Sequence, residues 1–330
     1  MITFGPVPSR RLGRSLGVNN IPPKLCSYSC VYCQVGRTLN VRAQRGTFYE
    51  AKEILEAVKR SLEKPERNGE PPDYISLVPD GEPTLDRNLG RTIELLKPLG
   101  IKIAVISNGS LMTDRAVRKA LGLADWVSLK VDSTHERTWR RTDRPHRSLE
   151  LRDILNGMLA FREVFSGELA TETMLVKDIN DGEDDIAGVA EFLGRLQPDK
   201  AYLSIPTRPP AEKRAEPPEE GVLNRAYQQL SEKVDHVEYL IGYEGNAFSS
   251  SGNVQEDLLS ITAVHPMRED AVQALLDRVA ADDSAVRGLV DRGLLLEAEY
   301  GGRRFYVRRF PRRSADGPTP PAERAGRPET

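Results

Sequence analysis

The sequence predicts an α/β fold in which a parallel sheet curls into a full or partial barrel, followed by a smaller C-terminal unit. From residue 15 to about residue 240, short apolar runs alternate with amphipathic helical patterns, which is typical of repeated strand–helix units. Most of these runs are nearly continuous, as expected for parallel strands covered on both faces. Six or so units suffice for a barrel, and a barrel of this kind binds ligands at the carboxyl ends of its strands.

Each strand of this predicted sheet is followed by a predicted helix or loop. The strands cover 15–18, 74–78, 101–107, 126–131, 169–176 and 200–205, with 237–241 as a possible seventh. The helices cover 51–64, 86–100, 113–123, 148–161, 182–196 and about 221–234. In the first helix Ile54, Leu55 and Val58 fall on one face, as the amphipathic pattern requires. Segment 206–220 holds five prolines and many charges, and is predicted to be a loop.

The pattern changes near residue 255, where three short helices are predicted at 255–266, 267–280 and 283–293. Two strand-like runs then flank Gly301-Gly302, which is a hairpin signal. Three helices and a hairpin are the order of a winged helix-turn-helix. The tail from Ser314 has almost no large apolar residues and is expected to be disordered. The predicted domains are therefore a barrel over 1–250, a winged-helix-like unit over 251–313 and a tail over 314–330.

The overall composition is that of an ordinary globular protein, with 47 basic and 49 acidic residues and a net charge of −2. Such a balance gives no global reason to expect nucleic-acid binding. No run of about 18 apolar residues suggests a membrane span, and the N-terminus lacks a secretory signal. A cytoplasmic location is therefore expected, and nothing in the sequence indicates an oligomeric state.

The only cysteines are Cys26, Cys30 and Cys33, spaced C-x3-C-x2-C on the loop after the first predicted strand. A disulfide is disfavoured by their odd number, their closeness and the expected reducing compartment. Three thiolates on one loop can hold three irons of a [4Fe-4S] cluster, which usually has four cysteine ligands. One iron then stays open for a small molecule. A Cys3His zinc site and unligated buried cysteines are the alternatives, although none of the four histidines is close in sequence.

The cysteine spacing, with Tyr32 before the last cysteine, resembles the radical S-adenosylmethionine superfamily. Three further motifs extend the resemblance, namely DGEPTL at 80–85, with Asp80 in place of a more usual glycine, SNGS at 107–110 and VDS at 131–133. All three follow predicted strands at the ligand-binding end. The resemblance implies a partial (β/α)6-type radical SAM barrel, carrying a C-terminal winged helix-turn-helix module.

The resemblance also implies the chemistry and the cofactors. A reduced cluster would donate one electron to the sulfonium of S-adenosylmethionine, giving methionine and a 5′-deoxyadenosyl radical that abstracts a substrate hydrogen. Gly81 would permit close backbone approach, the Glu82 region would hold the methionine amine, Asn108 and Asp132 would bind carboxylate or ribose hydroxyls, and Tyr32 would lie near the adenine. The structural alternatives are a turn at Glu82 and at Asn108 and a helix cap at Asp132. The partner would be an electron donor such as flavodoxin or ferredoxin.

Four segments, 5–24, 140–146, 172–181 and 202–212, look like a group related to wyosine-type tRNA-modifying synthases. That likeness covers about residues 4–250. The synthases that build the tricyclic base carry a second cluster on extra N-terminal cysteines, and this chain has no cysteine left for one. The resemblance therefore names no substrate, and RNA stays among the candidates.

Basic residues are candidates for binding an anionic substrate. Lys130 and Lys177 lie near predicted strand ends, where they could bind a phosphate or carboxylate or form an imine, or else pair with Asp132 or Glu172. Further clusters are Arg10, Arg11 and Arg14, then Arg140, Arg141 and Arg144, and six arginines between 303 and 313. Arginines of a wing contact phosphates, but a winged helix also docks on protein. The alternative function is an iron–sulfur redox-sensing, winged-helix nucleic-acid-binding regulator.

Overall fold

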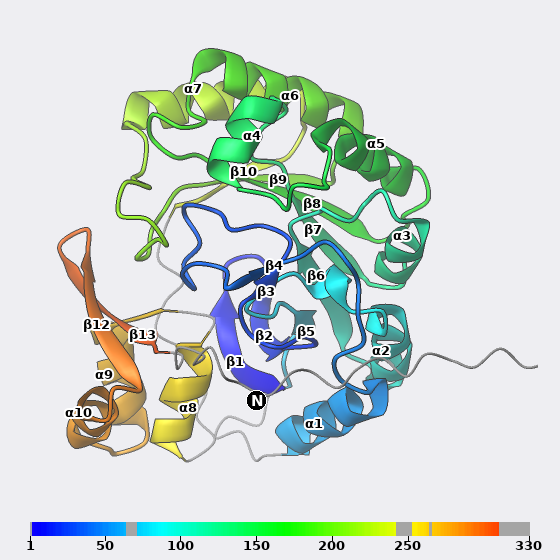
Figure 1. Cartoon of the computed structure of the whole chain (residues 1–330). Helices are drawn as coiled ribbons and strands as arrows, with labels where there is room; N and C mark the ends of the chain where they lie inside the picture. The colour runs from blue at the N-terminus through cyan, green and yellow to red at the C-terminus, as the bar shows by residue number, and fades with distance from the viewer. Residues whose placement is uncertain (1, 64–70, 242–252, 264–265, 310–330) are drawn as a thin grey trace, which may run out of the picture.

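The computed structural model describes residues 2–63, 71–241, 253–263 and 266–309. Its main feature is a curled eight-stranded sheet with helices on its outer side (Figure 1). The strand order is β1-β2-β5-β6-β7-β8-β9-β10, and every neighbouring pair from β2 to β10 is parallel. The described strands β1 and β10 stand at opposite ends of this order, so the sheet forms a partial barrel.

All the predicted strands of the barrel are present, including the optional seventh. They are β2 (Gly13–Val18), β5 (Tyr74–Leu77), β6 (Lys102–Ser107), β7 (Trp126–Lys130), β8 (Glu168–Met174), β9 (Lys200–Ser204) and β10 (Val237–Leu240). The helices are α1 (Ala51–Glu63), α2 (Leu89–Leu96), α3 (Arg115–Leu121), α4 (Glu136–Thr142), α5 (Leu151–Arg162), α6 (Glu183–Leu196) and α7 (Glu220–Ser231). Of these, α4 was not predicted, because Trp139 is the only large apolar side chain in its seven residues.

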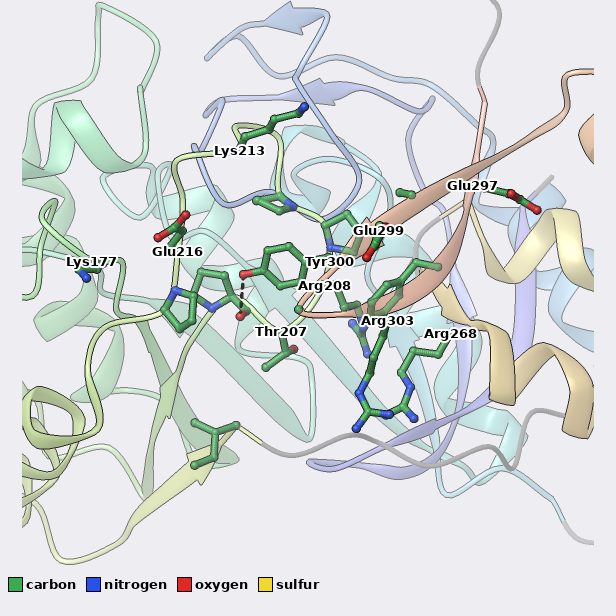
Figure 2. A pocket seen from close by; sticks show the side chains of 18 residues that line it. Lys177, Thr207, Arg208, Lys213, Glu216, Arg268, Glu297, Glu299, Tyr300 and Arg303 are labelled. Carbon is green, nitrogen blue, oxygen red and sulfur yellow. Dashed lines mark hydrogen bonds between the residues drawn. The ribbon is translucent and has the colours of Figure 1, made fainter.

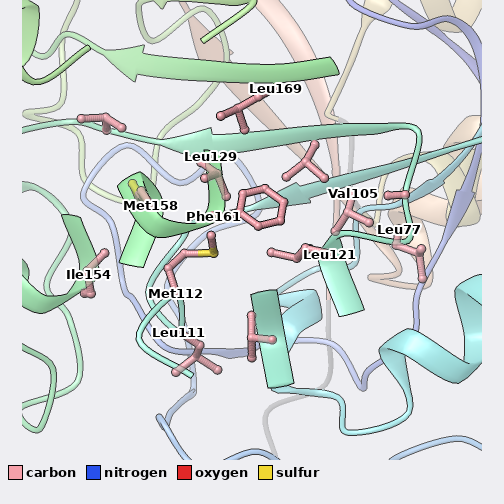
Figure 3. Close-up of a cluster of buried hydrophobic side chains, with 14 of the residues drawn as sticks. Leu77, Val105, Leu111, Met112, Leu121, Leu129, Ile154, Met158, Phe161 and Leu169 are labelled. Carbon is pink, nitrogen blue, oxygen red and sulfur yellow. The ribbon is translucent and has the colours of Figure 1, made fainter. Parts of the chain in front are cut away.

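The barrel core lies between the strands and the surrounding helices. Strand residues such as Leu77, Val105 and Leu129 are fully buried, and they face helix residues such as Leu121 and Phe161 (Figure 3). Burial on both faces explains why these strands read as continuous apolar runs. No helix in the described ranges is long and apolar enough to cross a membrane.

An additional strand, β1 (Thr3–Ser9), was not predicted, and it pairs antiparallel with β2. Its two prolines disguise it in the sequence, but proline is tolerated in an edge strand. The turn that joins β1 to β2 inserts Leu12 into the end of the barrel, where it packs with Trp126, Tyr202 and Leu240. β1 is therefore the edge strand at the N-terminal end of the sheet, and the turn after it adds Leu12 to the barrel interior.

The C-terminal unit has the predicted three helices and hairpin. They are α8 (Val254–Ile261), α9 (Glu269–Arg278), α10 (Ser284–Asp291), β12 (Leu295–Tyr300) and β13 (Arg303–Arg308), joined by a short strand β11 (Met267–Arg268) in the sheet order β11-β13-β12. Gly301 and Gly302 have φ of +58° and +68°, as a two-residue hairpin turn requires. The tail predicted to be disordered lies outside the described residues.

This C-terminal unit is not independent of the barrel. Phe4 and Val7 of β1 belong to the same buried cluster as Leu258, Leu275 and Leu289 of the unit. β1 thus pairs with the barrel sheet and also packs against the core of the C-terminal unit. The unit lies against the edge of the barrel that β1 forms (Figure 1).

Candidate functional site

The cysteine loop lies at the carboxyl ends of the barrel strands. Cys26 ends the short strand β3 (Leu25–Cys26), which pairs with β4 (Asn40–Val41), and Leu25 also bridges to Gly81 after β5. The last residue of α4 and the segment after it hold the loop through backbone bonds from Val31 N to Thr142 O at 2.9 Å and from His146 N to Ser27 O at 2.8 Å. The loop therefore has a defined shape that comes largely from residues more than 100 positions away.

The three thiols lie close together inside this loop. Burial raises the pKa of Cys30, and the neighbouring charges of Asp143, Cys33 and Cys26 raise it further. Burial also raises the pKa of Cys33, while Lys24 and Lys130 oppose that rise. A set of three neighbouring, shielded thiols with two cations beside them fits the donor requirement of an iron–sulfur cluster bearing net negative charge. Within the described ranges the three thiols do not surround one common point, because Cys26 and Cys33 line the cavity whereas Cys30 Sγ lies 3.3 Å from Asp143 Oδ1.

Gly81 lies directly against the cysteine loop. Its φ is +155°, and a Cβ there would lie 1.9 Å from the carbonyl oxygen of Leu25. The N–H of Glu82 donates to that same carbonyl at 3.1 Å. Only glycine permits this approach, so the DGEP turn and the cysteine loop are packed backbone to backbone.

The carboxylate of Glu82 is buried and already saturated with donors. It accepts from Ser107 Oγ at 2.7 Å, from Asn108 N at 2.7 Å, and from Thr84 N and Thr84 Oγ1 at 3.0 and 2.5 Å. Burial raises its pKa, and these four bonds only partly offset that effect. The turn interpretation is therefore correct locally, since Glu82 caps the 3-10 turn Pro83–Leu85, but the side chain also ties that turn to the end of β6.

Asn108 connects the end of β6 to the first cysteine. Its Nδ2 lies 2.9 Å from Ser27 Oγ and 3.5 Å from Cys26 Sγ, and its Oδ1 accepts from Ser110 N at 2.9 Å. The asparagine thus does more than form a turn with Gly109, because it reaches a thiol that is 82 residues earlier in the chain.

Asp132 and Tyr32 form a buried group with Asp143, which was not predicted as a site residue. The hydroxyl of Tyr32 donates to Asp132 and lies 3.1 Å from Asp143 Oδ1, which in turn is 3.3 Å from Cys30 Sγ. Burial and the charge of Asp132 raise the pKa of Asp143 well above its usual range. Asp132 also accepts from Met174 N at 2.7 Å, whereas the N-cap of α4 is His135, so the helix-cap alternative for Asp132 is wrong.

We call the cysteine loop together with Gly81 the rim of the site. A charged group lies next to this rim, in the barrel interior. Lys130 Nζ lies 3.3 Å from Glu172 and 4.7 Å from the centre of the Tyr32 ring, and Arg11 forms an ion pair with Glu172. Burial raises the pKa of Glu172, but Lys130 and Arg11 together outweigh it and bring the pKa to about 2. The salt-bridge alternative for Lys130 is therefore confirmed, and the lysine is held protonated. Lys177 lies 3.8 Å from Glu219 instead.

A cavity of about 330 Å³ joins the rim to the charged interior. Its lining includes Cys26, Tyr32, Cys33 and Gly81, and also the charged residues Arg11, Lys130 and Glu172. Glu82, Asn108 and Asp132 are not among its lining residues and lie behind the rim. The structure thus brings all the predicted site residues together, but it separates those that face the cavity from those that support them.

Comparison with known proteins gives consistent matches. The Radical SAM superfamily model matches residues 20–193. A UPF0026 protein of Methanocaldococcus jannaschii is 45% identical over 97% of this chain and 99% of its own length. Among solved structures, TYW1 with a lysine-pyruvate adduct bound has a TM-score of 0.51 at 18% identity, over 67% of this chain and 74% of that one. A radical SAM methyltransferase from Sphaerobacter thermophilus has a TM-score of 0.51 at 16% identity, over 68% and 66%. At these identities the two structures support the fold alone.

Proposed function

The chain belongs to the radical SAM superfamily, and from that premise we propose that Cys26, Cys30 and Cys33 hold its [4Fe-4S] cluster. The chain is an enzyme of this superfamily, whose cofactors are the cluster and S-adenosylmethionine. The observation that carries the proposal is a set of three thiols on one loop, close enough that Cys26 and Cys33 raise the pKa of Cys30, with Cys26 and Cys33 lining a cavity that also holds charged side chains. When bound, the cluster supplies the electron that cleaves S-adenosylmethionine into methionine and a 5′-deoxyadenosyl radical, which takes hydrogen from the substrate.

The residues at the rim and the residues behind it have different roles in this proposal. Gly81 and Tyr32 line the cavity and would contact the bound nucleotide. Glu82, Asn108 and Asp132 would act mainly by positioning, because each is already bonded to a neighbouring strand end or to the cysteine loop. Any contact of the Glu82 region with the methionine amine would then come from its backbone, since the carboxylate is occupied.

The substrate would enter the barrel interior below the rim. Lys130 and Arg11 supply two cations there, and Glu172 holds them at a defined place. This arrangement suits a substrate with an anionic group near the hydrogen to be removed, and RNA stays among the candidate substrates. The electron donor would be a flavodoxin or ferredoxin.

The C-terminal unit is proposed to be a winged helix-turn-helix domain over about 251–313, following a barrel domain over 1–250. The helix and strand order and the sheet order β11-β13-β12 support that assignment. Its hairpin, however, is bonded to the barrel, because Tyr300 donates to the carbonyl of Pro206 at 3.1 Å. This contact favours a role within the enzyme over the alternative of a nucleic-acid-binding regulator.

The test is anaerobic reconstitution of the full chain with iron and sulfide, followed by incubation with dithionite and S-adenosylmethionine. We expect about four irons per chain, as in a [4Fe-4S] cluster, and release of 5′-deoxyadenosine. Cys30→Ala should lose both. Ser29→Ala changes the same loop, but within the described ranges the Ser29 hydroxyl makes no hydrogen bond. This variant should therefore keep both the iron and the release of 5′-deoxyadenosine. An iron-loaded protein that releases no 5′-deoxyadenosine would overturn the assignment.

A further inference from the structure

The loop after α4 and the segment after β9 meet beside the cysteine loop at one carboxylate. Arg144, of the loop after α4, donates to Glu212, of the segment after β9. Arg214 Nε lies 3.0 Å from the same carboxylate, and Arg37, which comes just after Cys33, has a guanidinium nitrogen 3.6 Å from it. Three arginines from separate parts of the chain therefore share one glutamate, and we call these four residues the arginine patch.

Further contacts fix the arginine patch to the cysteine loop. Glu212 N donates to Val31 O at 3.0 Å, and Arg208, earlier in the same segment, donates to Gln34 Oε1 at 2.6 Å. Both acceptors belong to the part of the loop that carries the last two cysteines. The patch is therefore attached directly to the loop that holds the thiols.

The C-terminal unit holds the segment 206–217 from its other side. The segment forms one wall of a cleft of about 1220 Å³, and the C-terminal sheet forms the opposite wall (Figure 2). Tyr300, at the end of β12, donates to the carbonyl of Pro206 at 3.1 Å, as the dashed line in Figure 2 shows. Because the segment is fixed from both sides, the arginine patch is formed without a partner.

Positive charge is in excess in the arginine patch, because three guanidinium groups share one carboxylate. The bonds from Arg144 and Arg214 lower the pKa of Glu212, so this carboxylate is ionised and neutralises one of the three. The side chains of Arg37 and Arg214 are 70% and 63% exposed. A guanidinium has five N–H donors, so the two exposed arginines have donors left for a second anion.

The arginine patch lies close to the thiols but outside the space where the substrate would bind. Arg144 follows Asp143, whose Oδ1 lies 3.3 Å from Cys30 Sγ. In the described part of the chain, the four residues of the patch line neither the interior cavity nor the cleft at the C-terminal sheet. An anion bound at the patch would therefore approach Cys30 from the outer surface of the loop, and would leave the interior cavity open to the substrate.

We propose that the arginine patch docks the electron donor of the enzyme, a one-electron carrier protein whose surface carries carboxylates. Electron transfer between proteins slows steeply with distance, so a carrier must dock on the surface that lies nearest the cysteines. In each encounter the reduced carrier loses one electron and the [4Fe-4S] cluster gains it, and no proton or group is transferred. The proposal rests on the proposed function, because the chain needs a carrier only if the three cysteines hold a cluster.

Charge complementarity favours an acidic carrier at this patch. The planar fork of an arginine matches the two oxygens of a carboxylate, and the contacts of Glu212 show that the patch already binds that group. Leu39, two residues after Arg37, is 69% exposed and adds apolar area to the charged surface. Electron-transfer interfaces are small and weak, and exposed charges of opposite sign suit them because they speed the encounter.

The first measurement is calorimetric binding of two oxidised probes, a flavodoxin and a ferredoxin with net negative charge, to the reconstituted full chain. Arg37→Gln and Arg214→Gln should each weaken binding of the tighter probe by roughly 3- to 5-fold, the scale of an exposed charge pair. The matched control is Arg91→Gln, because Arg91 is 61% exposed and pairs with Glu94 on α2 at 3.2 Å. This control should bind the probes as the unaltered chain does.

The second measurement compares two reductants of the loaded enzyme. Dithionite is a small molecule that needs no docking site, so the double variant Arg37→Gln/Arg214→Gln should release 5′-deoxyadenosine with dithionite as fast as the unaltered chain. With reduced flavodoxin below its saturating concentration, the double variant should release it roughly tenfold more slowly, as two independent losses combine. Added salt should slow flavodoxin-driven release by the unaltered chain more than by the double variant.

The proposal is overturned if neither carrier binds, if the double variant binds the carriers as tightly as Arg91→Gln, or if the double variant also loses dithionite-driven release. It is overturned as well if a short single-stranded RNA binds the unaltered chain more tightly than either carrier and loses that binding in the double variant, because the patch would then serve RNA. An unaltered chain that binds a carrier but releases no 5′-deoxyadenosine with dithionite would instead overturn the proposed function.

Discussion

The two sides of the barrel mouth each bury a glutamate, and they use it in opposite ways. Glu82, after β5, is surrounded by neutral donors, and burial leaves its pKa raised. Burial also acts to raise the pKa of Glu172, on β8, but two cations bring that pKa to about 2. The same residue type thus fixes a loop on one side and holds permanent charge in a cavity on the other. The difference comes from the partners, since neutral donors offset desolvation less than opposite charges do.

Gly81→Ala tests the side of the barrel mouth that contains Glu82, where the turn after β5 packs against the cysteine loop. We call this the packed side, and this variant should have the largest effect. The new Cβ would meet the Leu25 carbonyl at 1.9 Å, and neither backbone can yield without moving the cysteine loop. We expect a loss of about 3 kcal/mol or more of stability and little bound iron, measured by urea unfolding and iron analysis. The control is Gly100→Ala, where φ is +75° and no atom lies within 4 Å, so only about 1–2 kcal/mol is expected. Equal losses in the two variants would show that close approach is not the cause.

Glu172→Gln tests the charged side. It removes the carboxylate that Lys130 and Arg11 share and leaves Lys130 with Asp132 alone at 3.9 Å, at a cost of about 3 kcal/mol. The variant should also alter the acid response. The folded pKa of Glu172, about 2, is below the ordinary 4.5, so the stability from this group is present above pH 4.5 and is lost as pH falls toward 2.

The measurement for Glu172 is urea unfolding between pH 7 and pH 3. The unaltered chain should lose about 2 kcal/mol from this group between pH 7 and pH 3, and Glu172→Gln should lose correspondingly less. Glu168→Gln is the control, because Glu168 begins the same strand and is exposed. A variant with the acid response of the unaltered chain would mean that the ion pair does not hold Glu172 ionised.

Tyr32→Phe removes the hydroxyl that lies between the carboxyl groups of Asp132 and Asp143. Asp132 and Asp143 would lose a shared partner while staying buried, which costs about 1–3 kcal/mol. Tyr49→Phe is the control, since the phenol of Tyr49 is only partly buried and makes no described hydrogen bond. Urea midpoints of the two variants that agree within error would contradict a bridging role for Tyr32.

Asn108→Ala should have the smallest effect. It removes the bonds to Ser27 and Ser110 and the 3.5 Å contact to Cys26, and leaves the backbone bond to Glu82. We expect about 1 kcal/mol less stability, an unchanged iron content and faster iron loss to a chelator. Failure to bind iron at all would mean that the packed side depends on this side chain rather than on Gly81 and Glu82.

Much of the barrel could be predicted because its signals are local. The apolar runs gave seven strands correctly, and the motifs after them came together at one end because parallel strands end on the same edge. The strand β1 was not predicted, because Gly5, Pro6 and Pro8 interrupt the apolar pattern that is typical of a strand. Asp143 lay inside a segment singled out by resemblance, but nothing local indicated that it would reach Cys30.

The sequence by itself determined the chain of strands and helices and the set of three thiols, because periodicity and spacing act over a few residues. Only the tertiary structure decided which carboxylate is charged, which side chain faces the cavity, and that the C-terminal sheet forms a cleft with segment 206–217. Those outcomes depend on partners that are far apart in sequence, such as Lys130 with Glu172 and Tyr300 with Pro206. Burial and charge pairing act through space, and the fold must exist before they can be assigned.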